Sequence, residues 1–122
     1  MINILKTLKN ELESLKIPYV YDKWESDVIL PFFVGELDEI PTDDEDGKSE
    51  YSFTLTGEDV ETYSNLYTYA EKLKKEYKQS KKIKLDGGYI VVSYENTQTI
   101  PIDLPSVKRI QIKFTIYLWE EE

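Results

Sequence analysis

Residues Val107 to Trp119 read VKRIQIKFTIYLW, and every second side chain from Ile110 onward is apolar. Because successive side chains of a strand point to opposite faces of a sheet, this period predicts one long strand with one buried face. The buried face carries Ile110, Ile112, Phe114, Ile116 and Leu118. The opposite face carries Arg109, Gln111, Lys113, Thr115, Tyr117 and Trp119.

Four further strands are expected upstream of this one. The segment after Pro18 is extended, because proline lacks the N–H donor that a continuing helix needs. Acidic residues, Pro41 and Gly47 then predict a long exposed loop over Gly35 to Ser49, joining two strands as a hairpin. A turn at Asp86 to Gly88 and a loop over Asn96 to Ser106 bound the fourth strand. The predicted strands are Ile17–Tyr21, Val28–Val34, Glu50–Thr56 and Tyr89–Glu95.

Two amphipathic helices complete the pattern. Leucines and isoleucines recur at spacings of three and four from Ile2 to Leu15, which predicts the first helix. The segment Thr56 to Asp59 fits a capping box, so the second helix is expected to run from Glu58 to Lys82. Its acids would lie in the first turn and its lysines near the end, where each charge complements the helix dipole.

The order of these elements favours an α+β fold. Helices separated by runs of strands are typical of a mainly antiparallel sheet, here of about five strands, with both helices packed on one face. No repeat, low-complexity tract or composition change divides the chain, so residues 1–122 are expected to form a single domain.

Composition removes most routes to catalysis. The chain has no His and no Cys, so it lacks the usual general base near neutral pH and any thiolate nucleophile or zinc ligand. The acid-rich loop does not fit a calcium-binding EF-hand, because aligning Gly47 with the loop glycine puts Phe53 where a bidentate Glu is required. We therefore expect no enzymatic activity, no cofactor and no metal site.

Charge is distributed unevenly along the chain, whose formal net charge is −9. The segment Glu36 to Glu61 contains eleven acidic residues and one lysine, for a net charge of −10. The segment Glu71 to Lys84 contains seven lysines and two glutamates, for a net charge of +5. The acidic total disfavours binding to phosphates. No apolar run suits a secretory signal or a membrane span, so the chain is expected in the cytoplasm where it is made.

Three groups of residues are candidates for an interface: the acidic loop, the lysines near the end of the second helix and the outer face of the last strand. The lysines from Lys72 to Lys84 either bind the phosphates of a nucleic acid or form a solvated helix end. The outer face of the last strand mixes aromatic and basic side chains, a composition enriched at protein interfaces; alternatively, the second helix covers it. The candidate interface residues are Asp43, Asp44, Glu45, Asp46, Lys78, Lys81, Lys82, Arg109, Lys113, Tyr117 and Trp119.

The element order and several strings resemble the tail terminator, or tail-completion, proteins of long-tailed bacteriophages. The likeness rests on the helix Ile2 to Leu15, the strings IPYVY from Ile17, LPFFV from Leu30 and YSFTL from Tyr51, the helix from Glu58 to Lys82, and Val107 to Trp119. The acidic Glu36 to Glu50 loop departs from the family pattern.

The resemblance implies a structural protein that forms a ring, typically hexameric, at the head–tail junction of the virion after synthesis in the host cytoplasm. Such a ring caps the tail tube, stops its polymerisation and docks the tail to the head. Its partners would be copies of itself, the major tail tube protein and a head-completion or neck protein, with DNA passing through the lumen without specific binding and no membrane involved. Two alternatives stay open: another ring component of the neck, and an acidic immunity or inhibitor module that neutralises a basic partner.

Overall fold

The last strand, β6 (Val107–Glu120), lies inside a six-stranded sheet. The computed structural model describes residues 2–21, 29–41 and 48–120. Before β6 the chain forms, in order, α1 (Ile2–Ser14), β1 (Tyr19–Tyr21), β2 (Phe32–Ile40), β3 (Lys48–Val60), α2 (Ser64–Tyr77), β4 (Lys81–Leu85) and β5 (Gly88–Thr99).

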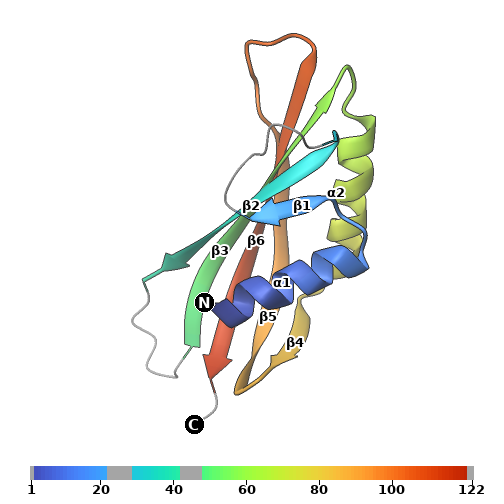
Figure 1. Cartoon of the computed structure of the whole chain (residues 1–122). Coiled ribbons are helices and arrows are strands. Elements are labelled where there is room, and N and C mark those ends of the chain that lie inside the picture. Colours follow the sequence, from blue (N-terminus) through green and yellow to red (C-terminus); the bar gives the residue numbers. More distant parts are fainter. Residues whose placement is uncertain (1, 22–28, 42–47, 121–122) are drawn as a thin grey trace.

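The strands are arranged in the order β1-β2-β3-β6-β5-β4 (Figure 1). Among the described strands only β1 and β2 pair in parallel, and the four other neighbouring pairs are antiparallel. The chain is therefore an α+β protein, as predicted, with one strand more than the sequence indicated and one parallel pair.

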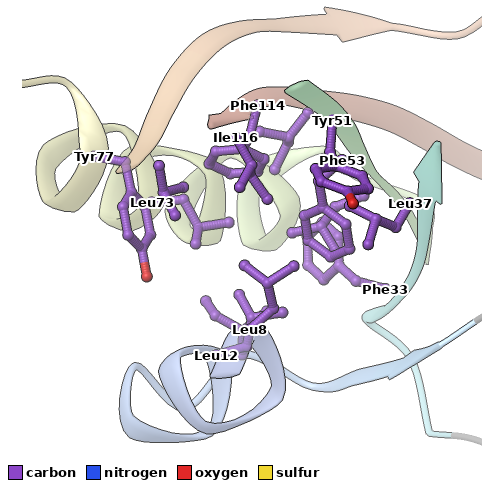
Figure 2. Close-up of a cluster of buried hydrophobic side chains, with 14 of the residues drawn as sticks. Leu8, Leu12, Phe33, Leu37, Tyr51, Phe53, Leu73, Tyr77, Phe114 and Ile116 are labelled. Atoms are coloured by element: carbon purple, nitrogen blue, oxygen red, sulfur yellow. The ribbon is translucent and has the colours of Figure 1, made fainter. Parts of the chain in front are cut away.

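Both helices pack on the same face of the sheet, because their buried side chains join one hydrophobic cluster with the inward side chains of the strands. Figure 2 shows Leu8 and Leu12 of α1 and Leu73 and Tyr77 of α2 pointing toward Phe114 of β6 and its neighbours. Every even-numbered residue of β6 from Ile110 to Leu118 is buried. The predicted two-layer arrangement and the buried face of this strand are confirmed.

The predicted start of the second helix is wrong. Strand β3 continues to Val60, and α2 begins only at Ser64, with no acidic residue in its first turn. Residues 57–60 remain in the strand because β6 supplies backbone partners for them. Gly57 lies opposite Ile110, and Glu58 lies opposite Arg109. A Cβ on Gly57 would lie 2.3 Å from Cε1 of Phe33, so this glycine lets the two strands pack closely.

The predicted end of that helix is also wrong. Helix α2 ends at Tyr77, and Lys81–Leu85 form the additional strand β4. In β4 the side chains of Ile83 and Leu85 are half-buried while Lys82 and Lys84 are exposed, which is the period of a strand. Lysines are common on edge strands, where their charge discourages unwanted pairing.

The predicted hairpin loop is shorter than expected. Its first part, Gly35–Ile40, belongs to β2, whose nine residues pair with β3 throughout. Pairing with β3 overrides the low strand propensity of the acids in this segment. The remainder of the expected loop includes Asp43, Asp44, Glu45 and Asp46, which lie outside the described residues.

Candidate interaction surfaces

The aromatic and basic residues of β6 lie on the face of the sheet opposite the helices. Arg109, Lys113, Tyr117 and Trp119 are odd-numbered and half-buried, whereas the even-numbered side chains are buried under the helices. The alternative in which the second helix covers these residues is therefore excluded. We call this side of the sheet the outer face.

One end of the outer face carries an aromatic corner, formed by Tyr89, Tyr117 and Trp119 with Lys48 and Lys82. The rings of Tyr89 and Trp119 stack with centroids 5.1 Å apart, and the ring of Tyr117 lies 6.0 Å from that of Trp119. Nζ of Lys82 lies 4.1 Å from the centroid of Tyr89, and Nζ of Lys48 lies 4.7 Å from that of Tyr117. Ammonium groups over aromatic faces are attracted by the ring quadrupole.

Sequence reasoning found Tyr117, Trp119 and Lys82 but missed Tyr89 and Lys48. The strand register brings these two in, because Tyr89 of β5 and Lys48 of β3 both lie opposite Trp119. The alternation of buried and half-buried side chains in β5 indicates that Tyr89 belongs to one face of the sheet. It does not indicate which strand lies beside β5.

Arg109 lies at the opposite end of the outer face and is matched by an acid from the same chain. Its guanidinium Nε donates a hydrogen bond of 2.9 Å to Oε1 of Glu58, and its terminal nitrogen contacts the same oxygen. Both side chains are partly buried. Arg109 therefore joins β6 to β3, and its charge is largely compensated within the chain. Lys113, the remaining candidate on this strand, lies between the two ends.

The predicted basic residues fall on two elements. Lys78 is exposed and caps α2 directly after its last residue, whereas Lys81 and Lys82 belong to β4. Nζ of Lys81 lies 2.8 Å from Oε1 of Glu76 and 3.0 Å from Oε1 of Glu11. Hydrogen bonds to Glu76 and then to Glu11 raise the pKa of Lys81. Lys81 therefore contributes to the contact between helices and sheet, while Lys82 faces outward.

The same contact includes the buried Tyr77. Its hydroxyl donates a hydrogen bond of 2.8 Å to Oε1 of Glu11, which links α2 to α1. Burial, and then the hydrogen bond to Glu11, raise the pKa of Tyr77. A small pocket of about 10 Å³ lies beside this ring.

Acidic and basic side chains lie near opposite edges of the sheet. Exposed acids of β2, namely Glu36, Asp38 and Glu39, lie near one edge, and the lysines of β4 form the other edge. Strands β3, β6 and β5 separate them, which corresponds to roughly 19 Å between β2 and β4 at normal strand spacing. The charge asymmetry of the sequence is therefore also an asymmetry in space.

Within residues 2–21, 29–41 and 48–120, no three acidic side chains are grouped as they would be to hold a metal ion. An open groove of about 570 Å³ lies between α1 and β1, lined by Leu5, Lys6, Lys9, Tyr19, Val20 and Tyr21. Neither described helix has the length and apolarity needed to cross a bilayer.

A scan against protein-family models gave no match, and a search of curated proteins found no significantly similar sequence.

Proposed function

We infer that the chain is a structural subunit that associates with copies of itself into a closed ring, which caps a tubular assembly in the manner of phage tail terminators. The observation that supports this most directly is that acidic side chains lie near one edge of the sheet and basic side chains lie at the other edge. A surface that is complementary to a different surface of the same molecule makes head-to-tail contacts, and these close into rings when the rotation between copies permits.

The outer face supplies a second surface for such a subunit. The aromatic corner combines stacked rings with lysines, and aromatic anchors dominate the binding energy of many protein interfaces. In the proposed assembly this corner contacts the tail tube protein or the neck protein. Excess acidic charge on a ring would let DNA pass through without adhering, since phosphates are repelled. The protein would act by shape and charge, not by chemical turnover.

Light scattering across a wide range of protein concentration tests self-association. We expect rings at high concentration, or in the presence of purified tail tubes if assembly needs a template, and rings visible at one end of each tube by electron microscopy. Salt should weaken the rings, because exposed charges are screened. A chain that stays monomeric under all these conditions and forms a one-to-one complex with a basic protein would instead support the inhibitor alternative.

A charge-matched pair of variants sharpens this test. Replacing Asp38 of β2 by Lys should weaken ring formation, whereas replacing Glu13, an exposed residue of α1 that belongs to neither charged strand, by Lys should not. Both substitutions change the net charge equally. Equal effects of the two variants would show that net charge alone, and not the placement of charge, governs association.

A further inference from the structure

Strand β4 forms one edge of the sheet. It pairs with β5 on one side, and among the described residues no strand lies on its other side. The structure describes every residue from Lys48 to Glu120, so β4 and the segments that join it to α2 and β5 are all placed. An unpaired strand edge presents backbone donors and acceptors that another strand can satisfy.

The turn after β4 fixes which backbone groups face this edge. The turn is two residues long, so Leu85 and Gly88 are the residues that flank it. In such a turn the carbonyl of the first flanking residue accepts a hydrogen bond from the N–H of the second, which makes Leu85 and Gly88 a hydrogen-bonded pair. Hydrogen-bonded pairs alternate along an antiparallel ladder, so the N–H and C=O groups of Lys82 and Lys84 point away from β5.

The side chains of the same two lysines have no acidic partner. Lys82 and Lys84 are exposed. Within residues 2–21, 29–41 and 48–120, neither forms an ion pair, and neither forms a hydrogen bond outside the ladder with β5. Lys81, in contrast, is matched by Glu11 and Glu76. The edge therefore combines open backbone groups with two uncompensated positive charges.

There is space beside this edge on both faces of the sheet. On the outer face, an open hollow of about 390 Å³ is lined by Lys82, Lys84, Gly88 and Tyr89. On the helix face, an open groove of about 300 Å³ lies between α1 and the residues from Lys84 to Asp86. Successive side chains of an added strand would point alternately into the hollow and into the groove.

Charge selects the kind of strand that can pair here. Two β4 strands paired antiparallel about Ile83 would place Lys82 opposite Lys84, and like charges directly opposite each other are unfavourable. A strand with two acidic residues separated by one position would instead form a favourable charge pair with each lysine. The residue between them falls beside Ile83, whose half-buried side chain packs against the core on the helix face. The edge therefore fits the pattern acidic, apolar, acidic.

This chain contains the pattern three times, beginning at Glu11, Glu36 and Asp59. The first lies in α1, the second in β2, and the third at the end of β3. Each of these segments already packs or pairs within its own subunit, which favours a different protein as the source of the added strand.

The aromatic rings beside β4 favour a peptide over a single-stranded nucleic acid. The ring of Tyr89 stacks on Trp119 with centroids 5.1 Å apart, and Nζ of Lys82 lies 4.1 Å from its own centroid. Because β4 and β6 lie on opposite sides of β5, these two neighbours cover opposite faces of the ring. Tyr89 therefore has no face left for a nucleobase, which stacking of single strands requires.

We propose that β4 binds an extended segment of another protein by strand addition, with acidic residues of that segment beside Lys82 and Lys84 and an apolar residue beside Ile83. This goes beyond the proposed ring, because the site is complete within one subunit. The ring directs the same basic edge toward a neighbouring copy, so a bound segment should compete with self-association.

Binding of a short synthetic peptide tests the charge pattern. The probe alternates Glu with Val and carries a fluorescent label, and anisotropy at low salt measures its affinity. The double variant K82Q/K84Q should bind it about fivefold more weakly, because two cross-strand charge pairs are lost. The variant K74Q/K75Q removes the same charge from α2 and should bind like the natural chain. Equal affinities of the two variants would overturn the assignment to β4.

Amide hydrogen exchange measured by NMR tests the backbone pairing. Bound peptide should protect the amides of Lys82 and Lys84 and leave that of Ile83, which already pairs with β5, unchanged. Lys84→Pro removes an outward N–H and keeps the ladder with β5, as proline does on edge strands. It should weaken binding more than Lys84→Gln, with circular dichroism as a check on folding. Peptide binding without protection of these amides would overturn strand addition.

Two further measurements separate this site from the ring. Oligothymidylate serves as a second probe, and its binding in preference to the peptide would overturn the acidic segment as occupant. Light scattering with and without peptide follows self-association. Rings that form equally well with peptide bound would support the site and show that the ring uses another basic surface. Absence of peptide binding would overturn the site, whether or not rings form.

Discussion

Replacing Gly57 by Ala is expected to destabilise the protein, and the sign of the effect distinguishes a strand from a helix at this position. An added Cβ would lie 2.3, 2.6 and 2.9 Å from three atoms of the Phe33 ring, whereas carbon atoms in contact prefer about 3.5 to 4.0 Å. The ring must therefore move by about 1 Å. Phe33 is fully buried and packs edge-on against Tyr69, so it has little room to move.

Overpacking of this kind costs about 1 to 3 kcal/mol, and the close backbone approach places this site near the upper end. If the segment were the first turn of a helix, as the capping-box pattern indicated, Ala would instead stabilise it by up to about 1 kcal/mol. Urea unfolding followed by circular dichroism measures the difference. A domain stable by about 5 to 15 kcal/mol still folds with this loss.

A double-mutant cycle identifies the contact responsible. Phe33→Leu removes most of the ring, so the penalty of Gly57→Ala should shrink by about 1 kcal/mol or more in that background. Gly87→Ala is a useful contrast, because nothing lies within 4 Å of its added Cβ and its cost comes only from the positive φ of 85°. A Gly57→Ala variant as stable as the natural protein would refute the packing argument.

Three further predictions concern polar groups. Burial, and then the charge of Tyr21, raise the pKa of Tyr19 from 10.0 to about 12; the folded state holds this proton more tightly, so Tyr19 contributes stability below pH 10 that is lost as the pH rises toward 12. Thermal melts across this range should show the loss, and Tyr19→Phe should reduce it. Tyr77→Phe removes the hydrogen bond to Glu11 and should cost about 1 to 2 kcal/mol in urea unfolding, with no change if the bond is absent. Glu58→Gln leaves the Arg109 guanidinium without its charged partner and should cost about 1 kcal/mol at low salt, less at high salt; a loss independent of salt would contradict an electrostatic contribution.

Local patterns predicted those elements whose burial follows directly from their own residues. The spacing of leucines placed α1 almost to its observed end, and the alternation from Val107 placed β6 and its two faces. In both, the apolar positions repeat with the period of the element, so the side chains alone specify which face is buried. The outward position of Arg109, Lys113, Tyr117 and Trp119 follows from the same alternation.

The errors lie where a partner strand outweighed local preference. Thr56 to Asp59 has the residues of a helix cap, but the length of β6 gives this stretch backbone partners and a close contact with Phe33. The acids of Glu36 to Ile40 suggested a loop, yet β3 pairs with all of them. Lysines suited to a helix end instead form an edge strand beside β5.

The sequence by itself determined the α+β class, the amphipathic elements and the separation of acidic from basic residues along the chain. Only the tertiary structure decided that these charges lie near opposite edges of one sheet, and that Tyr89 and Lys48 join Trp119. The reason is that strand order and register arise from contacts between distant segments, and no local period encodes which strand becomes a neighbour.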